Sequence, residues 1–300
     1  MAMRLRAFSL AGLLFFASGC GWLWPGGKTP GGFFGSRPKV GLVLGGGAVR
    51  GFAHVGVIRV LEREKIPIDF IVGTSVGSLV AAIYADKKNS FELEWIAFAL
   101  EERDLFDYTF ISPTQGFVRG DRLEDFIVKK LSAKEIQQLK MPFAAVATDI
   151  QEGEVVVLQS GSLARAVRAS SAIPGMFIPV RHQGKLLVDG GVLNNVPVDV
   201  ARKMGAEVVI AVDLDGGKKS ATVGNIFDTL AQTLYFMAAE NAEAKLKLAD
   251  IVVRPKVSDV ALLDFSRKKE LLTLGMEAAE AALPAIRAKL GLSAPASPGR

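Results

Sequence analysis

The chain has few of the residues that form disulfides, metal sites or nucleic-acid surfaces. Its 300 residues include one cysteine and two histidines. A single cysteine excludes a disulfide within the chain, and these three side chains form no recognisable metal-ligand cluster. Basic residues occur in nothing longer than pairs such as Lys129-Lys130, so the formal net charge of +5 does not indicate a nucleic-acid partner. No internal repeat is present, which argues against a repeat architecture.

The N-terminus lacks a hydrophobic run long enough to cross a bilayer. The apolar run covers residues 8–17, whereas a membrane-spanning helix needs about 20 apolar residues. Arg4 and Arg6 precede the run, and the small residues Ala17-Ser18-Gly19 follow it. A charged start, a short apolar core and a small-residue end are typical of a secretory signal. We therefore predict a signal peptide over residues 1–19.

Cys20 directly follows that predicted cleavage site. The arrangement resembles a bacterial lipobox, in which the cysteine is lipidated, although Ala17 stands where leucine is usual. Gly21 rather than aspartate follows, which in lipoproteins favours the outer membrane, so we expect a lipid-anchored protein of the bacterial cell envelope facing the periplasm. Ordinary cleavage next to an incidental cysteine is the alternative. Residues 20–39 are rich in Gly and Pro and predict a flexible tether.

From residue 40 onward, apolar strand-like runs alternate with helical patterns. This alternation predicts one α/β domain over residues 40–292, with a mostly parallel central sheet and helices on both faces, followed by a disordered tail over 293–300. The predicted strands are 40–44, 70–72, 143–148, 154–158, 185–188, 207–213 and 251–254. The predicted helices are 53–65, 78–85, 226–248 and 267–290. Parallel strands buried on both faces account for part of the high apolar fraction of 50%.

Residues 90–126 hold a large share of the aromatic side chains. They include Phe91, Trp95, Phe98, Phe106, Tyr108, Phe110, Phe117 and Phe126. The preferred interpretation is a set of helices that pack their apolar faces into the core. The alternative is a cap that offers apolar surface to acyl chains.

The stretch DFIVGTSVGSLVAAIYA, residues 69–85, places Ser75 between two glycines where an apolar strand gives way to a helix. The spacing G-x-S-x-G is typical of a nucleophile elbow, a strained turn that exposes the serine hydroxyl at the carboxyl edge of the sheet. A tight turn whose glycines only permit close packing is the other interpretation. The motif alone does not decide between them.

A glycine-rich loop, GGGAVRG over residues 45–51, follows the first predicted strand. Such a loop directs several backbone N–H groups into one concavity that stabilises an anion, either a phosphate or the oxyanion of an attacked ester. A dinucleotide-binding loop is disfavoured, because it needs an acidic residue at the end of the next strand. Asp69 precedes that strand and is poorly placed for this role.

A third glycine-marked loop places Asp189 at the end of a strand, before Gly190-Gly191. The glycines leave room around the carboxylate, so Asp189 can approach another catalytic group. A Ser75–Asp189 dyad uses both glycine-flanked residues. A triad with His182 and either Asp149 or Glu152 stays open on spacing alone. His54 lies in an apolar helix and is expected to be a packed, hydrogen-bonded residue.

Together these three loops resemble the patatin-like phospholipase family. The glycine loop, G-x-S-x-G and D-G-G occur here in the order and rough spacing of that family, and RASSAIPGMFIPV over residues 168–180 resembles its segment ahead of the aspartate. The likeness extends from about Val40 to Val212. Ala48 departs from it, because the family often has glycine there. We expect function to survive if the local φ at Ala48 is not positive.

The resemblance implies a patatin-like α/β/α fold and a serine acyl hydrolase that cleaves carboxylic esters of phospholipids or lysophospholipids. It implies Ser75 as the nucleophile and Asp189 as its base, with no metal or other cofactor. The implied oxyanion hole consists of Gly46, Gly47 and Ala48, with Arg50 fixing the loop or the anion. The motif glycines are Gly45, Gly51, Gly73, Gly77, Gly190 and Gly191. A non-catalytic lipid-binding envelope protein, and a small-ester hydrolase with a Ser-Asp-His triad, are the alternatives.

Overall fold

The computed structural model describes residues 37–105, 107, 116–214, 226–262 and 264–293. The predicted signal peptide, Cys20, the tether up to residue 36 and the tail from residue 294 lie outside the described residues. One compact unit begins at Arg37. Both guanidinium NH groups of Arg37 bind the Asp69 carboxylate at 2.7 Å, which ties the segment ahead of the first strand to the domain.

The described strands form one eight-stranded sheet. Its order is β5-β6-β3-β2-β1-β7-β8, with β4 paired to β3 as well. The strands are β1 (Val40–Leu44), β2 (Phe70–Thr74), β3 (Phe143–Asp149), β4 (Glu154–Leu158), β5 (Val180–His182), β6 (Lys185–Asp189), β7 (Val208–Val212) and β8 (Ile251–Val253). β1, β2, β3, β7 and β8 are parallel, whereas β4 and β6 run antiparallel to β3. The prediction of a mostly parallel central sheet is confirmed.

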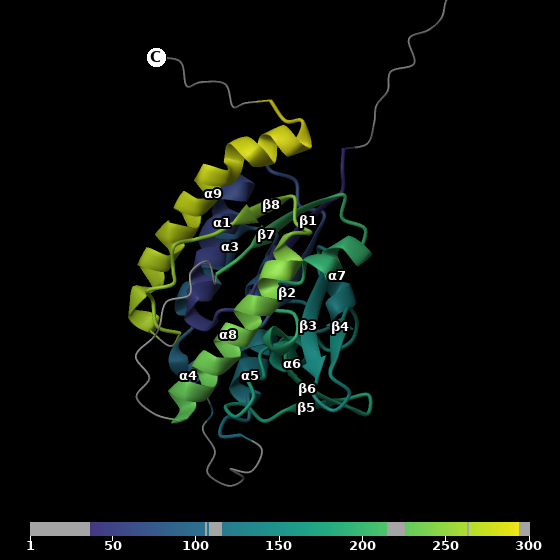
Figure 1. The fold of residues 1–300 in the computed structure, drawn as a ribbon, viewed down its shortest axis with the longest axis vertical. Coiled ribbons are helices and arrows are strands. Elements are labelled where there is room, and N and C mark those ends of the chain that lie inside the picture. Colours follow the sequence, from purple (N-terminus) through teal and green to yellow (C-terminus); the bar gives the residue numbers. More distant parts are fainter. Residues whose placement is uncertain (1–36, 106, 108–115, 215–225, 263, 294–300) are drawn as a thin grey trace, which may run out of the picture. The chain divides into compact units, whose positions relative to one another are not determined.

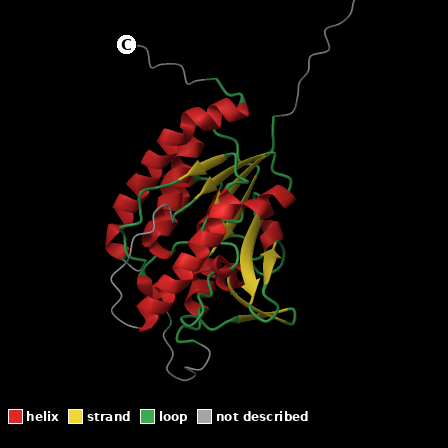
Figure 2. Cartoon of the chain, in the orientation of Figure 1, coloured by secondary structure: helices red, strands yellow, loops and turns green. Residues whose placement is uncertain are grey.

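Helices cover both faces of this sheet, which gives the predicted three-layer α/β/α arrangement (Figures 1 and 2). The helices are α1 (Phe52–Arg63), α2 (Val76–Lys87), α3 (Ser90–Ala99), α4 (Glu102–Leu105), α5 (Asp121–Lys130), α6 (Leu163–Ser170), α7 (Val198–Lys203), α8 (Ile226–Leu246) and α9 (Lys268–Leu290). Short 3-10 turns occur at Ala48–Gly51, Ile136–Gln138, Gly190–Val192 and Phe265–Arg267. None of the helices described here is long and apolar enough to cross a membrane.

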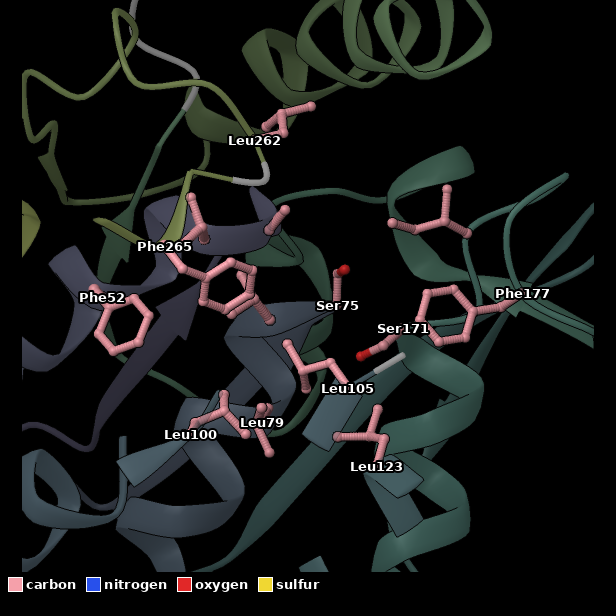
Figure 3. A pocket seen from close by; sticks show the side chains of 14 residues that line it. Phe52, Ser75, Leu79, Leu100, Leu105, Leu123, Ser171, Phe177, Leu262 and Phe265 are labelled. Atoms are coloured by element: carbon pink, nitrogen blue, oxygen red, sulfur yellow. The ribbon is translucent and has the colours of Figure 1, made fainter. Parts of the chain in front are cut away.

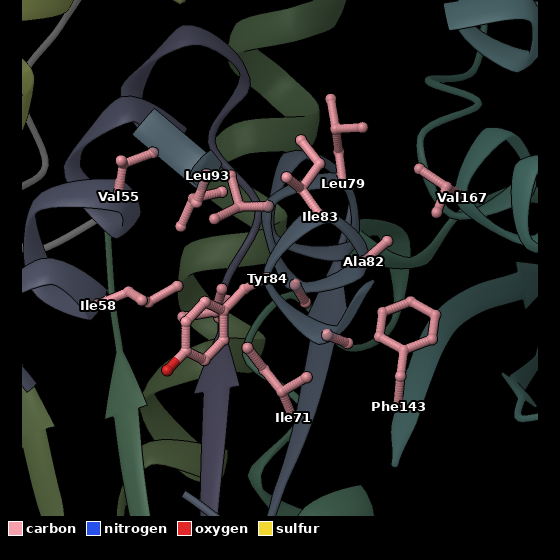
Figure 4. Packing of buried hydrophobic residues seen from close by; sticks show 14 of the residues in the cluster. Val55, Ile58, Ile71, Leu79, Ala82, Ile83, Tyr84, Leu93, Phe143 and Val167 are labelled. Carbon is pink, nitrogen blue, oxygen red and sulfur yellow. The ribbon is translucent and has the colours of Figure 1, made fainter. Parts of the chain in front are cut away.

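The core divides into two clusters because successive side chains of a strand point to opposite faces. Leu42 and Leu44 of β1 pack in the cluster under α1, α2, α3, α6 and α9, whereas Val43 packs in the cluster under α7 and α8. Figure 4 shows the first cluster, where Ile58 of α1 and Ile83 of α2 lie among apolar neighbours. Because both faces are covered, every residue of β1, β2, β3 and β7 is buried.

Residues 90–126 contribute side chains to the core, to the pocket described below and to the exposed surface. Its core positions include Leu93 and Phe126, which are buried. Phe91 and Trp95 are 73% and 74% exposed on one side of α3, so the prediction that this segment buries its apolar faces is wrong for them. Because they are one helical turn apart, both lie on the side of α3 opposite Leu93. Phe106, Tyr108 and Phe110 lie outside the described residues.

β2 and β6 meet end to end along one edge of β3. Val146 of β3 pairs with Thr74 of β2 on one edge and with β4 on the other. β6 lies on the same edge of β3 as β2, because β4 occupies the other edge, and Asp189 of β6 pairs with Ala147. Since β2 is parallel to β3 and β6 is antiparallel, their carboxyl ends point toward each other. Ser75, which follows Thr74, is thereby brought to Asp189.

Candidate active site

Ser75 occupies a strained turn between β2 and α2. Its φ of 54° and ψ of −129° lie outside the regions that a residue with a side chain normally adopts. Gly73 and Gly77 make the turn possible, because a Cβ on Gly77 would lie 2.3 Å from the carbonyl oxygen of Leu44 and one on Gly73 would lie 2.4 Å from that of Gly77. Ser75 therefore lies in a strained strand-to-helix turn, and the flanking glycines permit its close packing.

A second serine fixes the backbone of this elbow. The N–H of Ser75 donates to Oγ of Ser170 at 3.0 Å, and the Ser170 hydroxyl donates to the carbonyl oxygen of Val146 at 2.6 Å. Ser170 is fully buried at the end of α6. Because the hydroxyl has both a donor and an acceptor as partners, it holds the elbow to β3 in one geometry.

The Asp189 carboxylate is buried and uses only one oxygen for the local turn. Oδ1 accepts from the N–H of Gly191 at 2.7 Å, whereas the buried Oδ2 has no hydrogen-bond partner of good geometry among the residues that the structure describes. Burial raises the pKa of Asp189 to about 6, against the smaller lowering effects of the nearby Ser75 hydroxyl and the Gly191 N–H. Ser75 and Asp189 are therefore close but not tightly bonded, as often occurs in unliganded active sites.

The glycine-rich loop presents fewer free N–H groups than the sequence suggested. The N–H of Gly46 already donates to the carbonyl oxygen of Asn195 at 3.2 Å. Within the described chain, no acceptor is found for the N–H groups of Gly47 and Ala48. A Cβ on Gly46 would lie 3.2 Å from the Cβ of Ser75, so the loop lies beside the elbow.

Ala48 adopts a left-handed conformation. Its φ is +48°, so the condition under which the alanine was expected to be harmless is not met. A residue with a Cβ in this region is strained by roughly 1–2 kcal/mol relative to glycine. The rest of the fold holds the loop in place, because the N–H of Val49 donates to the carbonyl oxygen of Leu262 at 3.1 Å.

Arg50 and His54 hold the glycine-rich loop in place through hydrogen bonds to backbone carbonyl oxygens. Arg50 is buried and its guanidinium donates to the carbonyl oxygens of Val260 at 2.9 Å and Ser258 at 3.1 Å, so it joins the loop to the segment ahead of α9. His54 bonds through Nε2 to the carbonyl oxygen of Gly45 at 2.8 Å. Burial lowers the pKa of His54 to about 4, so the ring is neutral and Nε2–H is the donor. His54 is packed and hydrogen-bonded, as predicted.

His182 lies too far along its hairpin to complete a triad. It pairs with Lys185, four residues before Asp189, which corresponds to about 13 Å at the usual strand rise. The Asp149 carboxylate is engaged by Lys185 at 3.3 Å, and Glu152 is exposed. The residues available for a histidine triad are therefore not brought together.

The remaining motif glycines allow close backbone contacts. A Cβ on Gly51 would lie 2.3 Å from Cγ2 of Val76, and one on Gly190 would lie 2.2 Å from the carbonyl oxygen of Val146. At Gly191 a Cβ would lie 3.0 Å from Oδ1 of Asp189. The N–H of Gly45 extends the β1–β7 pairing by donating to Val212 at 3.1 Å. These glycines bring the three loops into contact.

Ser75 opens into an apolar pocket (Figure 3). The pocket region holds about 620 Å³ of empty space, a volume that includes open solvent at its mouth. Its described lining is Ala48, Val49, Phe52, Ser75, Val76, Leu79, Leu100, Leu105, Leu123, Ser171, Ile173, Phe177, Leu262 and Phe265. All of these except Ser75 and Ser171 are apolar. Part of the aromatic segment thus contributes to the pocket, through Leu100, Leu105 and Leu123.

Three residues that assemble the site carry no signal in the sequence pattern. Ser170 holds the elbow, and the carbonyl oxygens of Asn194 and Asn195 accept from Thr74 Oγ1 at 2.9 Å and from Gly46. Ser170 lies in the quoted segment over residues 168–180, and Asn194-Asn195 follows the Asp189 loop in the sequence. Their partners are distant in sequence, so the residue types alone did not indicate which backbone groups they bind.

Comparisons with known proteins identify related sequences. Residues 42–202 match the family model described as patatin-like phospholipase. The lysophospholipase NTE1 of Scheffersomyces stipitis is 33% identical over 278 residues, which cover 82% of this chain and 18% of that protein. The patatin-like phospholipase domain-containing protein 6 of Homo sapiens is 36% identical over 202 residues, which cover 64% of this chain and 14% of that protein. The chain therefore spans less than a fifth of the length of these relatives.

A solved structure shares the fold. VipD from Legionella pneumophila superposes with a TM-score of 0.57 at 15% sequence identity, over 83% of this chain and 67% of the VipD chain. At this identity the match concerns the fold alone.

Proposed function

The chain belongs to the patatin-like phospholipase family, and we propose that it is a serine acyl hydrolase that cleaves carboxylic esters of phospholipids or lysophospholipids. One observation carries the proposal: a strained serine opens into an apolar pocket beside the buried Asp189 carboxylate, whose Oδ2 makes no hydrogen bond of good geometry with any described residue. A binding protein has no need of this arrangement. The names of the relatives and the apolar lining favour a lipid acyl chain as the part of the substrate that enters the pocket.

In the proposed reaction, Asp189 Oδ2 accepts the proton of the Ser75 hydroxyl as Oγ attacks the ester carbonyl carbon. The negative charge that develops on the carbonyl oxygen is stabilised by the N–H groups of Gly47 and Ala48, and one such donor typically contributes about 2.7–4 kcal/mol. Collapse of this intermediate expels the alcohol, which takes the proton from Asp189, and leaves an acyl group on Ser75. Water, deprotonated by Asp189, then releases the fatty acid.

Asp189 is suited to this exchange because its pKa of about 6 lies closer to neutral pH than that of an ordinary aspartate. A base is most effective when its pKa lies near the working pH. The second oxygen, Oδ1, stays bonded to Gly191, so the carboxylate keeps its orientation while Oδ2 exchanges the proton.

The test is labelling of the full chain with a fluorophosphonate, with the adduct located by mass spectrometry, and assay on a lysophospholipid and a phospholipid. We expect an adduct on Ser75, and loss of hydrolysis by at least 1,000-fold in Ser75→Ala and Asp189→Asn. Ser162→Ala, on the N-cap of α6, is the matched control and should retain activity. Well-folded wild type that neither labels nor hydrolyses any ester would instead favour the non-catalytic lipid-binding alternative.

We further propose that Cys20 is lipidated and anchors the protein in a bacterial outer membrane, facing the periplasm. Several acyl chains, at about 0.8 kcal/mol per buried CH₂, would hold it there stably. Incorporation of an alkyne-labelled fatty acid into wild type but not into Cys20→Ser would support this proposal. Equal labelling of both proteins would contradict it.

A further inference from the structure

Three consecutive residues at the end of α6 all face the proposed active site. Ser170 holds the N–H of Ser75, and the carbonyl oxygen of Ala172 accepts from the N–H of Asp189 at 2.8 Å. Ser171 lies between them and lines the pocket. Its own N–H donates to the carbonyl oxygens of Val167 at 3.0 Å and Arg168 at 3.2 Å. The position of Ser171 is thereby coupled to both members of the dyad.

The Ser171 hydroxyl is the one polar side chain, besides the nucleophile, in the described lining of the pocket. Figure 3 shows the Ser75 and Ser171 side chains inside the same ring of apolar residues. No described residue hydrogen-bonds the Ser171 hydroxyl, whereas its neighbour Ser170 is bonded twice. A hydroxyl both donates and accepts, and it loses its water when an acyl chain fills the pocket. A purely hydrocarbon ligand therefore leaves it unsatisfied.

We propose that Ser171 is a specificity-determining residue whose hydroxyl binds a hydroxyl group of the substrate close to the scissile ester. This inference rests on the proposed ester hydrolysis. The ester carbonyl oxygen is assigned to the N–H groups of Gly47 and Ala48, so the partner of Ser171 is a second oxygen. That oxygen has two sources: a free glycerol hydroxyl on the alcohol side, as in a monoacyl lipid, or a hydroxyl on the acyl chain near the carbonyl.

The test compares three esters with the same chain length: propyl dodecanoate, 1-dodecanoylglycerol and propyl 3-hydroxydodecanoate. The first has no hydroxyl, the second has hydroxyls on the alcohol side and the third has one on the acyl side. The full chain is assayed as wild type, Ser171→Ala and Ser171→Thr, with all esters in the same detergent micelles. The quantity measured is the ratio of kcat/KM for each hydroxylated ester to that for propyl dodecanoate.

We expect Ser171→Ala to lower this ratio about tenfold for one of the two hydroxylated esters, as for the loss of one neutral hydrogen bond. The affected ester identifies the source of the hydroxyl. Ser171→Thr keeps a hydroxyl and should retain most of the wild-type ratio. Ser170→Ala is the matched control: it disturbs the elbow, so it should lower kcat/KM for all three esters by a similar factor and leave the ratios unchanged.

Two results would overturn the inference while leaving the proposed function intact. One is turnover with the same ratios in wild type and Ser171→Ala. The other is an equal loss on all three esters in Ser171→Ala, which would mean that Ser171 only supports the fold of the site. If wild type hydrolyses none of these esters and no phospholipid or lysophospholipid, the proposed function fails, and the role of Ser171 fails with it.

Discussion

Thr74 and Asp189 are neighbours along one edge of β3, opposite the consecutive residues Val146 and Ala147. Two strands that are distant in sequence therefore end at the same point, one arriving in parallel and the other antiparallel. Each is followed at once by a glycine-marked turn, and the nucleophile is the first residue after Thr74. The dyad is positioned by backbone pairing on a third strand, so its geometry does not depend on long, flexible side chains.

The first prediction concerns the pH dependence of hydrolysis. Asp189 must be deprotonated to accept the proton of Ser75, and burial raises its pKa to about 6. We expect kcat/KM to be constant above about pH 7 and to fall toward tenfold per pH unit below about pH 6. The measurement is kcat/KM for a soluble ester from pH 4.5 to pH 8.5. A midpoint near the ordinary aspartate value of 3.8 would contradict the role of burial.

The second prediction concerns stability. The pKa of Asp189 is higher in the folded than in the unfolded protein. The folded state therefore binds more protons than the unfolded state between about pH 4 and pH 6. Because of this difference, the protein becomes less stable as the pH rises through that window. Asp189→Asn removes the buried charge. It should be more stable than wild type by about 3 kcal/mol at pH 7, and the difference should vanish near pH 4. Urea denaturation at both pH values measures it.

Asp264→Asn is a control of opposite sign for that experiment. Hydrogen bonds from the Ser266 hydroxyl and N–H lower the pKa of Asp264, so its contribution to stability is present above the ordinary aspartate pKa and is lost as the pH falls. Asp264→Asn should therefore be less stable than wild type at pH 7. A shift of the same sign in both variants would mean that the effect at Asp189 does not arise from its burial.

The centre of the sheet could be predicted because β1 and β7 are apolar and buried on both faces. Val40–Leu44 was predicted with the bounds that the structure shows. β5 was not predicted, because Arg181 and His182 are polar and the strand lies at the sheet edge, where its alternation is too short to detect. α6 was missed as well: it is only eight residues long, and Arg165 and Arg168 interrupt its small apolar residues.

The residues of the dyad could be predicted more readily than the hydrogen bonds and packing that position them. Ser75 and Asp189 stood out because glycines flank each of them. The N–H of Gly46 donates to the carbonyl oxygen of Asn195, and Ala48 adopts a left-handed conformation. Both features depend on how the loop packs against residues distant in sequence. Local patterns carry no information on such contacts. The same reason hides Ser170, whose two partners lie on β3 and at the elbow.

The third prediction concerns Ser170. Ser170→Ala leaves the carbonyl oxygen of Val146 and the N–H of Ser75 without this partner inside the core, which should cost about 1–3 kcal/mol of stability. The elbow should also lose its fixed orientation, and we expect kcat to fall about 10-fold to 100-fold, as for a small displacement of a reacting group. Ser162→Ala, at the other end of α6, should lose about 1 kcal/mol of stability with kcat unchanged. Equal kcat in both variants would rule out a positioning role for Ser170.

The last prediction concerns Ala48. Its φ of +48° is costly for alanine and costs glycine little, whereas glycine also has more freedom in the unfolded chain. The strain relieved at positive φ, roughly 1–2 kcal/mol, is larger than the entropy that glycine adds to the unfolded chain, about 0.4–1 kcal/mol. Ala48→Gly should therefore raise the free energy of unfolding by about 0.5–1 kcal/mol. The N–H of residue 48 is retained, and hydrolysis should persist.

Ala281→Gly, at an exposed helical position of α9, is the control and should instead lower stability by about 1 kcal/mol. Urea denaturation of the two variants beside wild type compares the same substitution in the two backbone conformations. A loss of stability in both would mean that residue 48 is not held in the left-handed region in solution.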